Sequence, residues 1–436
     1  MRINSLEIKN FRNLETFSVE FNPNLTVLVA NNSAGKTSIL DAVSIVLGSY
    51  IGSFPTEKNS GFNYQDATVK TKGDEPQYPI SVLSNITIQK HQKKIYRELP
   101  AKGRKTTTVN AKALSEYAKV NYTKLVKKES VGLPIVAYYG TGRLYKETKI
   151  SKAKYEKEQA ARSYGYHNAL NPNSNYKEFR EWYIEQSNIE INFIRKSLQS
   201  NQGLDLEQSP NYRLLSRIKE SINTILKHLN WHNFNFNGED LVIENAQGVE
   251  IAIDNLSDGV KNMLTLVADI AYRCAKLNPS LDNASKQTEG IVLIDEIEMH
   301  LHPSWQQSVL HDLRTIFPNI QFIITTHSPQ VLSSIKNSNI RIIDPINQEA
   351  IVPIVNPYGK ESVVALEDIM RVSSTPPQEV VSETALLKEY LSTIQKGDID
   401  NSNLAKMRQK LNSIYGTDYS KLLTADMIIN KFKALK

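Results

Sequence analysis

The sequence predicts an α/β fold with a mainly parallel sheet, an inserted basic and helical subdomain and a helical C-terminal tail. Four apolar runs typical of strands buried on both faces of a sheet occur at 25–29, 134–139, 291–294 and 322–325. The first run is followed by a polar loop and by a helix-like stretch at 37–47. Because these runs come from both ends of the chain, we expect one sheet with the middle of the chain as an insertion.

The other elements are predicted from hydrophobic periodicity. Apolar residues alternate through 17–21, which indicates a strand before the first buried run. Amphipathic patterns predict helices at 179–198, 214–229 and 260–277. The tail after residue 356 is expected to be helical, with a break at Pro376 and Pro377.

Composition excludes several classes of protein. The 436 residues are 40% hydrophobic, which is enough for a folded core and excludes global disorder. Mean hydropathy is −0.39 and no apolar run is long enough for a membrane span, so no membrane partner is expected. The first residues lack the apolar stretch of a secretory signal, which predicts a cytoplasmic location. The single cysteine, Cys274, cannot form an internal disulfide, and we expect it to pack in the core.

Positive charge is concentrated in one region. The net charge is +6, but 12 Lys and Arg against 2 Glu lie between Lys90 and Lys128, which leaves −4 for the rest of the chain. This run could contact DNA or RNA phosphates, with Tyr96, Tyr117 and Tyr122 between the cations. A solvated lysine face is an equally good interpretation. The candidate nucleic-acid contacts are Lys93, Lys94, Arg97, Arg104 and Lys105.

A phosphate-binding loop is predicted between the first buried run and the helix after it. Backbone N–H groups and a helix N-terminus would face the phosphates of ATP. Lys36 would reach the β- and γ-phosphates, and Thr37 would bind Mg²⁺. Ala30 stands where the pattern has glycine and fits if its φ is negative. The candidate nucleotide-binding residues are Ala30, Asn31, Asn32, Ser33, Ala34, Gly35, Lys36, Thr37 and Ser38.

Two later strands supply the second half of the predicted site. The run at 291–294 ends in Asp295, which can support the Mg²⁺ shell, and Glu296, which is placed to orient or deprotonate the attacking water. The run at 322–325 is followed by His327, a candidate contact to the γ-phosphate or the water.

A further motif precedes the helix at 260–277 and lies upstream of the acidic strand. It comprises Leu256, Ser257, Asp258, Gly259 and Lys261. Its position resembles the signature sequence of ABC-type ATPases, in which the signature helix of one protomer points at the γ-phosphate held by another. The resemblance therefore implies an ATP site shared between two copies of the chain. An ordinary helix N-cap at Ser257 and Asp258 is compatible with this reading.

Glu298, His300 and His302 admit two interpretations. The His-x-His pattern with carboxylates could form a zinc or iron site. The segment also coincides with the subunit-contacting D-loop of ABC-type ATPases, and a Leu-His-Pro sequence is common there in RecF- and OLD-like ATPases. Interface contacts are the better interpretation.

Taken together, the motifs resemble the RecF/SMC-like ATPases of the AAA_15/AAA_21 class, with an ABC-type P-loop ATPase head. In similar proteins a basic residue at the position of Arg12 touches the nucleotide, and Arg143 is a possible second contact. Within this class the compact chain looks like the PtuA ATPases of Septu and retron antiphage systems. The segments that carry the resemblance are 10–12, 30–37, 138–143, 256–261, 295–305 and 325–328.

The resemblance implies a function and a set of partners. It implies an ATP- and Mg²⁺-dependent ATPase, at least dimeric, that controls a separate HNH-type nuclease resembling PtuB and that could bind retron nucleic acid. A DNA repair or maintenance ATPase of RecF/SMC type is the alternative, and a transporter ATPase is disfavoured by the large insertion. The predicted segments are 1–50 (N-terminal ATPase part), 51–133 (basic insertion), 134–149 (core strand and loop), 150–239 (helical insertion), 240–356 (second ATPase part) and 357–436 (tail).

Overall fold

The structure of the chain is a computed structural model that falls into two compact units. They are Met1–Met370 and Arg371–Lys436. No helix within the described residues has the length and apolar character needed to cross a membrane. The structure describes residues 1–31, 33–55, 57, 59–70, 73–142, 161–173, 176–199, 209, 211–372, 378–396 and 403–435.

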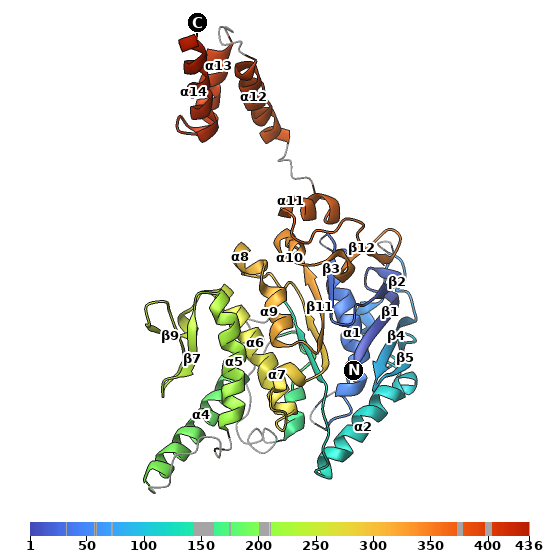
Figure 1. Cartoon of the computed structure of the whole chain (residues 1–436). Helices are drawn as coiled ribbons and strands as arrows, with labels where there is room; N and C mark the ends of the chain where they lie inside the picture. The colour runs from blue at the N-terminus through green and yellow to red at the C-terminus, as the bar shows by residue number, and fades with distance from the viewer. Residues whose placement is uncertain are drawn as a thin grey trace. The chain divides into compact units, whose positions relative to one another are not determined.

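One large sheet organises the first unit (Figure 1). In the described residues its strand order is β5-β4-β1-β2-β13-β12-β3-β11-β10-β6. The strands are β1 Arg2–Phe11, β2 Leu14–Glu20, β3 Leu25–Val29, β4 Ile80–Ile88, β5 His91–Leu99, β6 Ile135–Tyr139, β10 Gly290–Ile294, β11 Ile320–Thr326, β12 Ile340–Asp344 and β13 Glu349–Ile351.

The sheet has a parallel half and an antiparallel half. The strands β12, β3, β11, β10 and β6 pair in parallel, and β13 also pairs in parallel with β2. The strands β2, β1, β4 and β5 form antiparallel pairs. Every residue of β3, β6, β10 and β11 is buried, as expected for strands covered on both faces. The predicted α/β fold is confirmed.

Helices form where the apolar patterns predict them. The predicted amphipathic helices at 179–198, 214–229 and 260–277 are present as α4, α5 and α6. A small sheet of β7 His232–Phe236, β8 Leu241–Glu244 and β9 Glu250–Ala252 adjoins α5 (Figure 1). The helices of this unit include α1 Lys36–Ile51, α2 Lys112–Val126, α4 Tyr176–Gln199, α5 Tyr212–His228, α6 Asp258–Leu277, α7 Ala284–Gln287, α8 Pro303–Gln306, α9 Val309–Ile316, α10 Pro329–Ser333 and α11 Ser362–Val364.

The basic segment is part of the main sheet. Its hairpin, β4 and β5, pairs with β1 over seven residues of β1, so it extends the sheet at one edge. Alternate residues of β4 and the second half of β5 are buried in the main core. The hairpin therefore shares its core with the strands at the other end of the sheet.

The second unit is helical and has its own core. It contains α12 Gln378–Gln395, α13 Leu404–Tyr415 and α14 Ser420–Leu435. Its buried residues include Leu387, Tyr390, Leu411 and Leu422. The first unit extends to Met370, beyond residue 357 where the tail is predicted to begin, because Ala365 and Ile369 are buried in the main core.

Candidate functional site

The three strands that lead into the predicted motifs are neighbours in the sheet. In the parallel register, Val29 of β3 lies opposite Thr326 of β11, and Ile324 of β11 lies opposite Ile294 of β10. Parallel strands end at the same edge, where α/β proteins bind ligands. The phosphate-binding loop, the acidic pair and His327 are therefore brought together from distant parts of the chain.

The phosphate-binding loop has the backbone that its sequence requires. Gly35 occupies the N-cap of α1 with a φ of 99°, and an added Cβ would lie 3.0 Å from the side chain of Leu14. Asn13 Nδ2 supports the loop by donating to the carbonyl of Ser33 at 2.7 Å. Ala30 is not among the non-glycine residues with positive φ, so its Cβ is accommodated. Asn32 lies outside the described residues.

Lys36 folds back onto its own loop. Its Nζ donates to the carbonyls of Ala30 at 2.8 Å and Asn31 at 3.2 Å. Burial lowers the pKa of Lys36 below 10.5, although the nearby carboxylates of Asp295 and Glu296 act in the opposite direction. These contacts hold an ammonium group at the start of α1, where the helix N-terminus also favours an anion.

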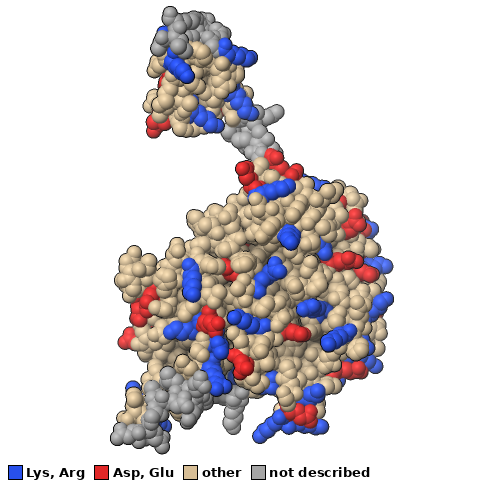
Figure 2. Space-filling view, viewed as in Figure 1, with Lys and Arg blue, Asp and Glu red and all other residues tan. Residues whose placement is uncertain are grey.

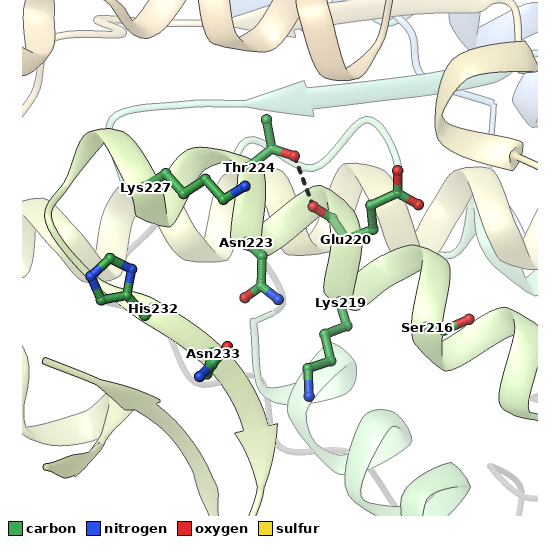
Figure 3. Close-up of a pocket in the computed structure, with 8 residues that line it drawn as sticks. All are labelled: Ser216, Lys219, Glu220, Asn223, Thr224, Lys227, His232 and Asn233. Atoms are coloured by element: carbon green, nitrogen blue, oxygen red, sulfur yellow. Dashed lines mark hydrogen bonds between the residues drawn. The ribbon is translucent and has the colours of Figure 1, made fainter. Parts of the chain in front are cut away.

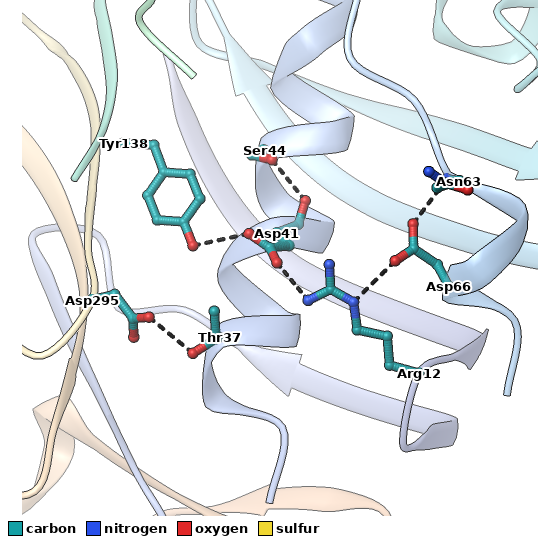
Figure 4. Close-up of polar contacts among 8 residues, drawn as sticks. All are labelled: Arg12, Thr37, Asp41, Ser44, Asn63, Asp66, Tyr138 and Asp295. Carbon is teal, nitrogen blue, oxygen red and sulfur yellow. Dashed lines mark hydrogen bonds and ion pairs between the residues drawn. The ribbon is translucent and has the colours of Figure 1, made fainter. Parts of the chain in front are cut away.

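Thr37 and Asp295 meet across the site (Figure 4). The Thr37 hydroxyl donates to Asp295 Oδ2 at 2.9 Å, and the Thr325 hydroxyl donates to Asp295 Oδ1 at 2.5 Å. Mg²⁺ prefers oxygen ligands at about 2.1 Å in octahedral geometry, which puts adjacent ligands about 3.0 Å apart. The hydroxyl oxygen of Thr37 and Oδ2 of Asp295 have the spacing of two adjacent Mg²⁺ ligands. The two residues therefore fit a Mg²⁺ ion.

Glu296 and His327 follow the ends of β10 and β11. The backbone N–H of Glu296 donates to Thr325 Oγ1 at 2.8 Å, and its φ is 47°, a conformation that non-glycine residues rarely adopt. The backbone N–H of His327 donates to the Glu298 carboxylate. Both candidate catalytic residues are thus fixed at the backbone by side chains of the adjacent strand or loop.

Arg12 lies in an ion-pair network beside α1 (Figure 4). Its guanidinium donates to Asp41 at 2.5 Å and to Asp66 at 3.0 Å. The Tyr138 hydroxyl donates to the other oxygen of Asp41 at 2.9 Å. Burial raises the pKa of Asp41, and the Arg12 charge opposes this rise. A nucleotide contact by Arg12 stays a prediction, and Arg143 lies outside the described residues.

The signature motif is at the N-terminus of α6. Ser257 occupies the N-cap position and is exposed, and in the described structure its side chain makes no capping hydrogen bond to α6. Asp258 is also exposed, Lys261 is half-buried and Leu256 is buried. A Cβ at Gly259 would collide with the carbonyl oxygen of His300. The exposed end of a long helix is suited to bind an anion.

The residues of the alternative metal site have other contacts. Glu298 accepts hydrogen bonds from Thr326 and His327, and the His302 ring caps α8 at Ser304. Among the described residues no group of three or more His, Cys, Asp or Glu side chains is placed to hold a metal ion. The D-loop interpretation of the segment stays a prediction.

The candidate nucleic-acid residues divide into two groups. Four of them are exposed: Lys93, Lys94, Arg104 and Lys105. Arg97 is 1% exposed, and its guanidinium donates to the carbonyls of Ile45, Ser60 and Thr107, so the prediction that it contacts nucleic acid is wrong. Burial lowers the pKa of Arg97 to about 10.

Two of the three tyrosines between the lysines pack against other aromatic side chains of the first unit. Tyr117 packs on Tyr50 and Tyr122 packs on Phe54, with both partly buried against the main core. Their rings are therefore engaged with other aromatic residues. On the face seen in Figure 2, Lys and Arg side chains are interspersed with Asp and Glu over the described residues.

A separate polar pocket of about 590 Å³ lies between α5 and β7 (Figure 3). Lys219, Lys227 and His232 supply positive or titratable groups, and Glu220 supplies an acid. Glu220 pairs with Arg217 at 3.0 Å, and Lys219 donates to Asn235 at 3.3 Å. The pocket contains none of the phosphate-loop or acidic-strand residues.

Several residues of the site were not predicted. Asn13 supports the phosphate loop, Asp41 and Asp66 bind Arg12, and Thr325 holds both Asp295 and Glu296. Thr325 could have been recognised, because a threonine at the end of an apolar strand is a polar group that needs buried partners. Asn13 and Asp66 carry no local signal, since their partners are 20 and 54 residues away.

Comparison with known proteins identifies the family. Residues 1–332 match the family AAA_15, described as an AAA ATPase domain. A protein of Vibrio cholerae serotype O1 biovar El Tor named "Retron Vc95 probable ATPase" is 30% identical over 91% of this chain and 84% of its own length. The "Septu protein PtuA" of Bacillus mycoides is 25% identical over 78% of this chain and 40% of its own length.

A solved structure is also similar. The Smc head domain of Pyrococcus furiosus, solved with a bound ScpA domain, has a TM-score of 0.47 and 16% identity over 81% of this chain and 96% of that chain. The family match covers more than half of the residues and includes the phosphate loop, the signature motif and the acidic strand. This chain therefore belongs to the AAA_15 family of AAA ATPase domains and is an ATPase.

Proposed function

We propose that this chain is the ATP-binding and ATP-hydrolysing subunit of an antiphage defence complex and that it controls a separate HNH-type nuclease. The observation that carries the proposal is the convergence of Lys36, the Thr37–Asp295 pair and Glu296 at one edge of the sheet. The similarity to a retron ATPase over 91% of the chain supports the defence setting.

The chemistry can be assigned to residues of this chain. When ATP binds, Lys36 exchanges its two carbonyl partners for phosphate oxygens, which bind an ammonium more strongly. Thr37 and Asp295 would hold Mg²⁺, which neutralises phosphate charge. Glu296 orients and deprotonates the water, and His327 contacts the γ-phosphate or that water.

The ATP site is proposed to be completed by a second copy of the chain. Ser257 and Asp258 are exposed at the N-terminus of α6, and the Ser257 side chain does not cap its own helix in the described structure. An exposed helix N-terminus with a hydroxyl group can bind the γ-phosphate held by the partner. The expected assembly is a dimer formed in the presence of ATP.

The dimer is tested with a variant that binds ATP without turning it over. Glu296→Gln should bind ATP and form a dimer that light scattering detects, while its turnover falls by about 10²- to 10⁴-fold. Adding Ser257→Arg, which puts a bulky side chain at the exposed N-cap, should leave nucleotide binding intact and abolish the dimer. An unchanged dimer in the double variant would contradict the shared site, and normal turnover by Glu296→Gln would contradict the assigned base.

The nuclease partner is proposed to dock on the C-terminal helical unit. Leu423 and Met427 of α14 are 44% and 72% exposed and, four residues apart, share one helix face. Leu423→Glu with Met427→Glu should spare ATP binding and lose a co-expressed HNH-type nuclease in a pull-down. Lys421→Glu with Lys431→Glu on the same helix is the charge control. A complex that still forms with the variant carrying Leu423→Glu and Met427→Glu would contradict this docking site.

The neighbouring genes distinguish this proposal from a DNA repair or maintenance ATPase. An adjacent HNH nuclease or reverse transcriptase gene supports defence, whereas adjacent replication genes support the RecF/SMC-like alternative. A reverse transcriptase gene would also support retron nucleic acid as a ligand. Co-purification with DNA or RNA under low salt would test that ligand directly.

A further inference from the structure

Glu298 connects the loop after β10 to the end of β11. One carboxylate oxygen accepts a hydrogen bond from the Thr326 hydroxyl at 2.8 Å, and the other accepts from the backbone N–H of His327. The Thr326 oxygen also accepts from the N–H of Ser328 at 3.0 Å, which leaves its proton to Glu298. A carboxylate suits this position because both of its partners are donors.

The same loop is tied to the signature helix on its other side. Asn262, a buried residue in the second turn of α6, donates from Nδ2 to the carbonyl of Met299 at 2.8 Å. Gly259 lies directly against the His300 carbonyl, where no side chain would fit. Residues 298–300 are therefore held between α6 and the end of β11.

These contacts link three functional segments through one series of hydrogen bonds. Asn262 belongs to the helix that starts with the signature motif, Met299 and Glu298 belong to the loop that follows Glu296, and His327 follows β11. Short hydrogen-bonded connections between packed elements limit how far one can move alone. A displacement of α6 would therefore be transmitted to His327 through this loop.

We propose that Glu298 is a positioning residue for ATP hydrolysis, which holds His327 in place relative to Glu296 and couples His327 to the signature helix through Met299 and Asn262. The inference rests on the proposed roles of Glu296 and His327. The two hydrogen bonds of Glu298 hold the backbone N–H of His327 and the side chain of Thr326. Removing them therefore allows the backbone that carries the imidazole to move, in addition to the side-chain torsions. Misplacement of a group by about 1 Å can cost about 100-fold in rate.

The test is a double-mutant cycle on the full chain. Glu298→Ala is expected to lower kcat for ATP about 10- to 100-fold, with the KM changed less than about threefold. His327→Ala is expected to have a similar effect. If Glu298 acts through His327, the double variant loses little more than His327→Ala alone. Glu298→Gln should restore most of kcat, because its amide oxygen can accept from His327 N–H and its amide N–H can donate to Thr326 Oγ1.

Three further variants separate positioning from folding. Glu220→Ala removes an exposed carboxylate on α5 and should leave kcat and thermal stability unchanged. Asn262→Ala should lower kcat in the same direction as Glu298→Ala but to a smaller extent. If Glu298→Ala is too unstable to assay, Glu298→Gln and Thr326→Val carry the test, because Thr326→Val removes only one of the two contacts and predicts an intermediate kcat.

The outcomes separate this inference from the proposed function. Multiplicative effects of Glu298→Ala and His327→Ala, or an unchanged kcat in Glu298→Ala, would overturn the positioning role while leaving the ATPase assignment intact. Full activity of His327→Ala would overturn the role of His327 and the inference with it. Loss of ATP binding in Glu298→Ala, measured with a fluorescent nucleotide, would instead show that Glu298 acts on the Lys36 side of the site.

Discussion

Two regions of the molecule carry cations that were considered as phosphate contacts, and they differ in how they present these cations. At the nucleotide site Lys36 is 7% exposed, its Nζ is held by two backbone carbonyls, and the carboxylates of Asp295 and Glu296 act on its charge. On the β4–β5 hairpin, Lys93 and Lys94 are exposed on the edge strand of the sheet. The first region is a preorganised site, and the second is a charged surface.

The comparison shows which kind of sequence signal is informative. The nucleotide site was predicted from residue types at fixed spacing next to buried strands, and each type has one chemical task. The candidate nucleic-acid contacts on the hairpin were chosen from a count of cations, and a count does not separate surface charges from buried ones. Arg97 was in that count, yet its guanidinium satisfies backbone carbonyls. Lysines on an edge strand also protect that strand from pairing with strands of other chains. This role explains exposed lysines without a bound ligand.

The largest expected effect is at the nucleotide site. Lys36→Ala should weaken ATP binding by at least about 100-fold, because charge-assisted hydrogen bonds of about 1.5–3 kcal/mol each are lost. Isothermal titration with ATP measures the change, and Lys94→Ala is the matched control. Equal affinities of Lys36→Ala and the wild type would remove the distinction between the two regions.

The next effect separates Arg97 from its exposed neighbours. Arg97→Met keeps an apolar side chain of similar length but leaves the carbonyls of Ile45 and Ser60 without this donor. We expect the free energy of unfolding to fall by about 2–4 kcal/mol, measured by urea denaturation. Lys94→Met on the same strand should change it by less than about 0.5 kcal/mol. Similar values for the two variants would show that Arg97 is not a structural anchor.

A smaller effect is expected on nucleic-acid binding. Lys93→Glu with Lys94→Glu should weaken any binding of single-stranded DNA and lower the slope of log affinity against log salt by about 1 to 2. Fluorescence anisotropy at several salt concentrations gives this slope. A wild-type affinity that does not depend on salt would exclude phosphate contacts by the hairpin.

The smallest effect is a pH dependence confined to the nucleotide site. Burial lowers the pKa of Lys36 below 10.5, so the free site loses its ammonium at a lower pH than an exposed lysine would. ATP affinity should therefore decline as the pH rises from about 7 to about 10. A constant ATP affinity up to about pH 10 would contradict the lowered pKa of Lys36.

Much of the fold and the centre of the site could be predicted from sequence. The buried strands β3, β10 and β11 contain the apolar runs at 25–29, 291–294 and 322–325, and the residues after them are the ones that meet in space. What could not be predicted depends on pairing between distant segments. The place of β13 between β2 and β12, the burial of Arg97 and the contacts of Glu298 follow from register and packing, which have no local pattern.

The strand order also has a consequence for biosynthesis. The strand that leads into the phosphate loop, β3, is made early, but its two neighbours in the sheet are β11 and β12, which the ribosome adds about 300 residues later. A nascent chain therefore carries its phosphate-binding loop for most of translation without Asp295, which completes the nucleotide site. Prematurely terminated products that stop before β10 would be unable to consume ATP.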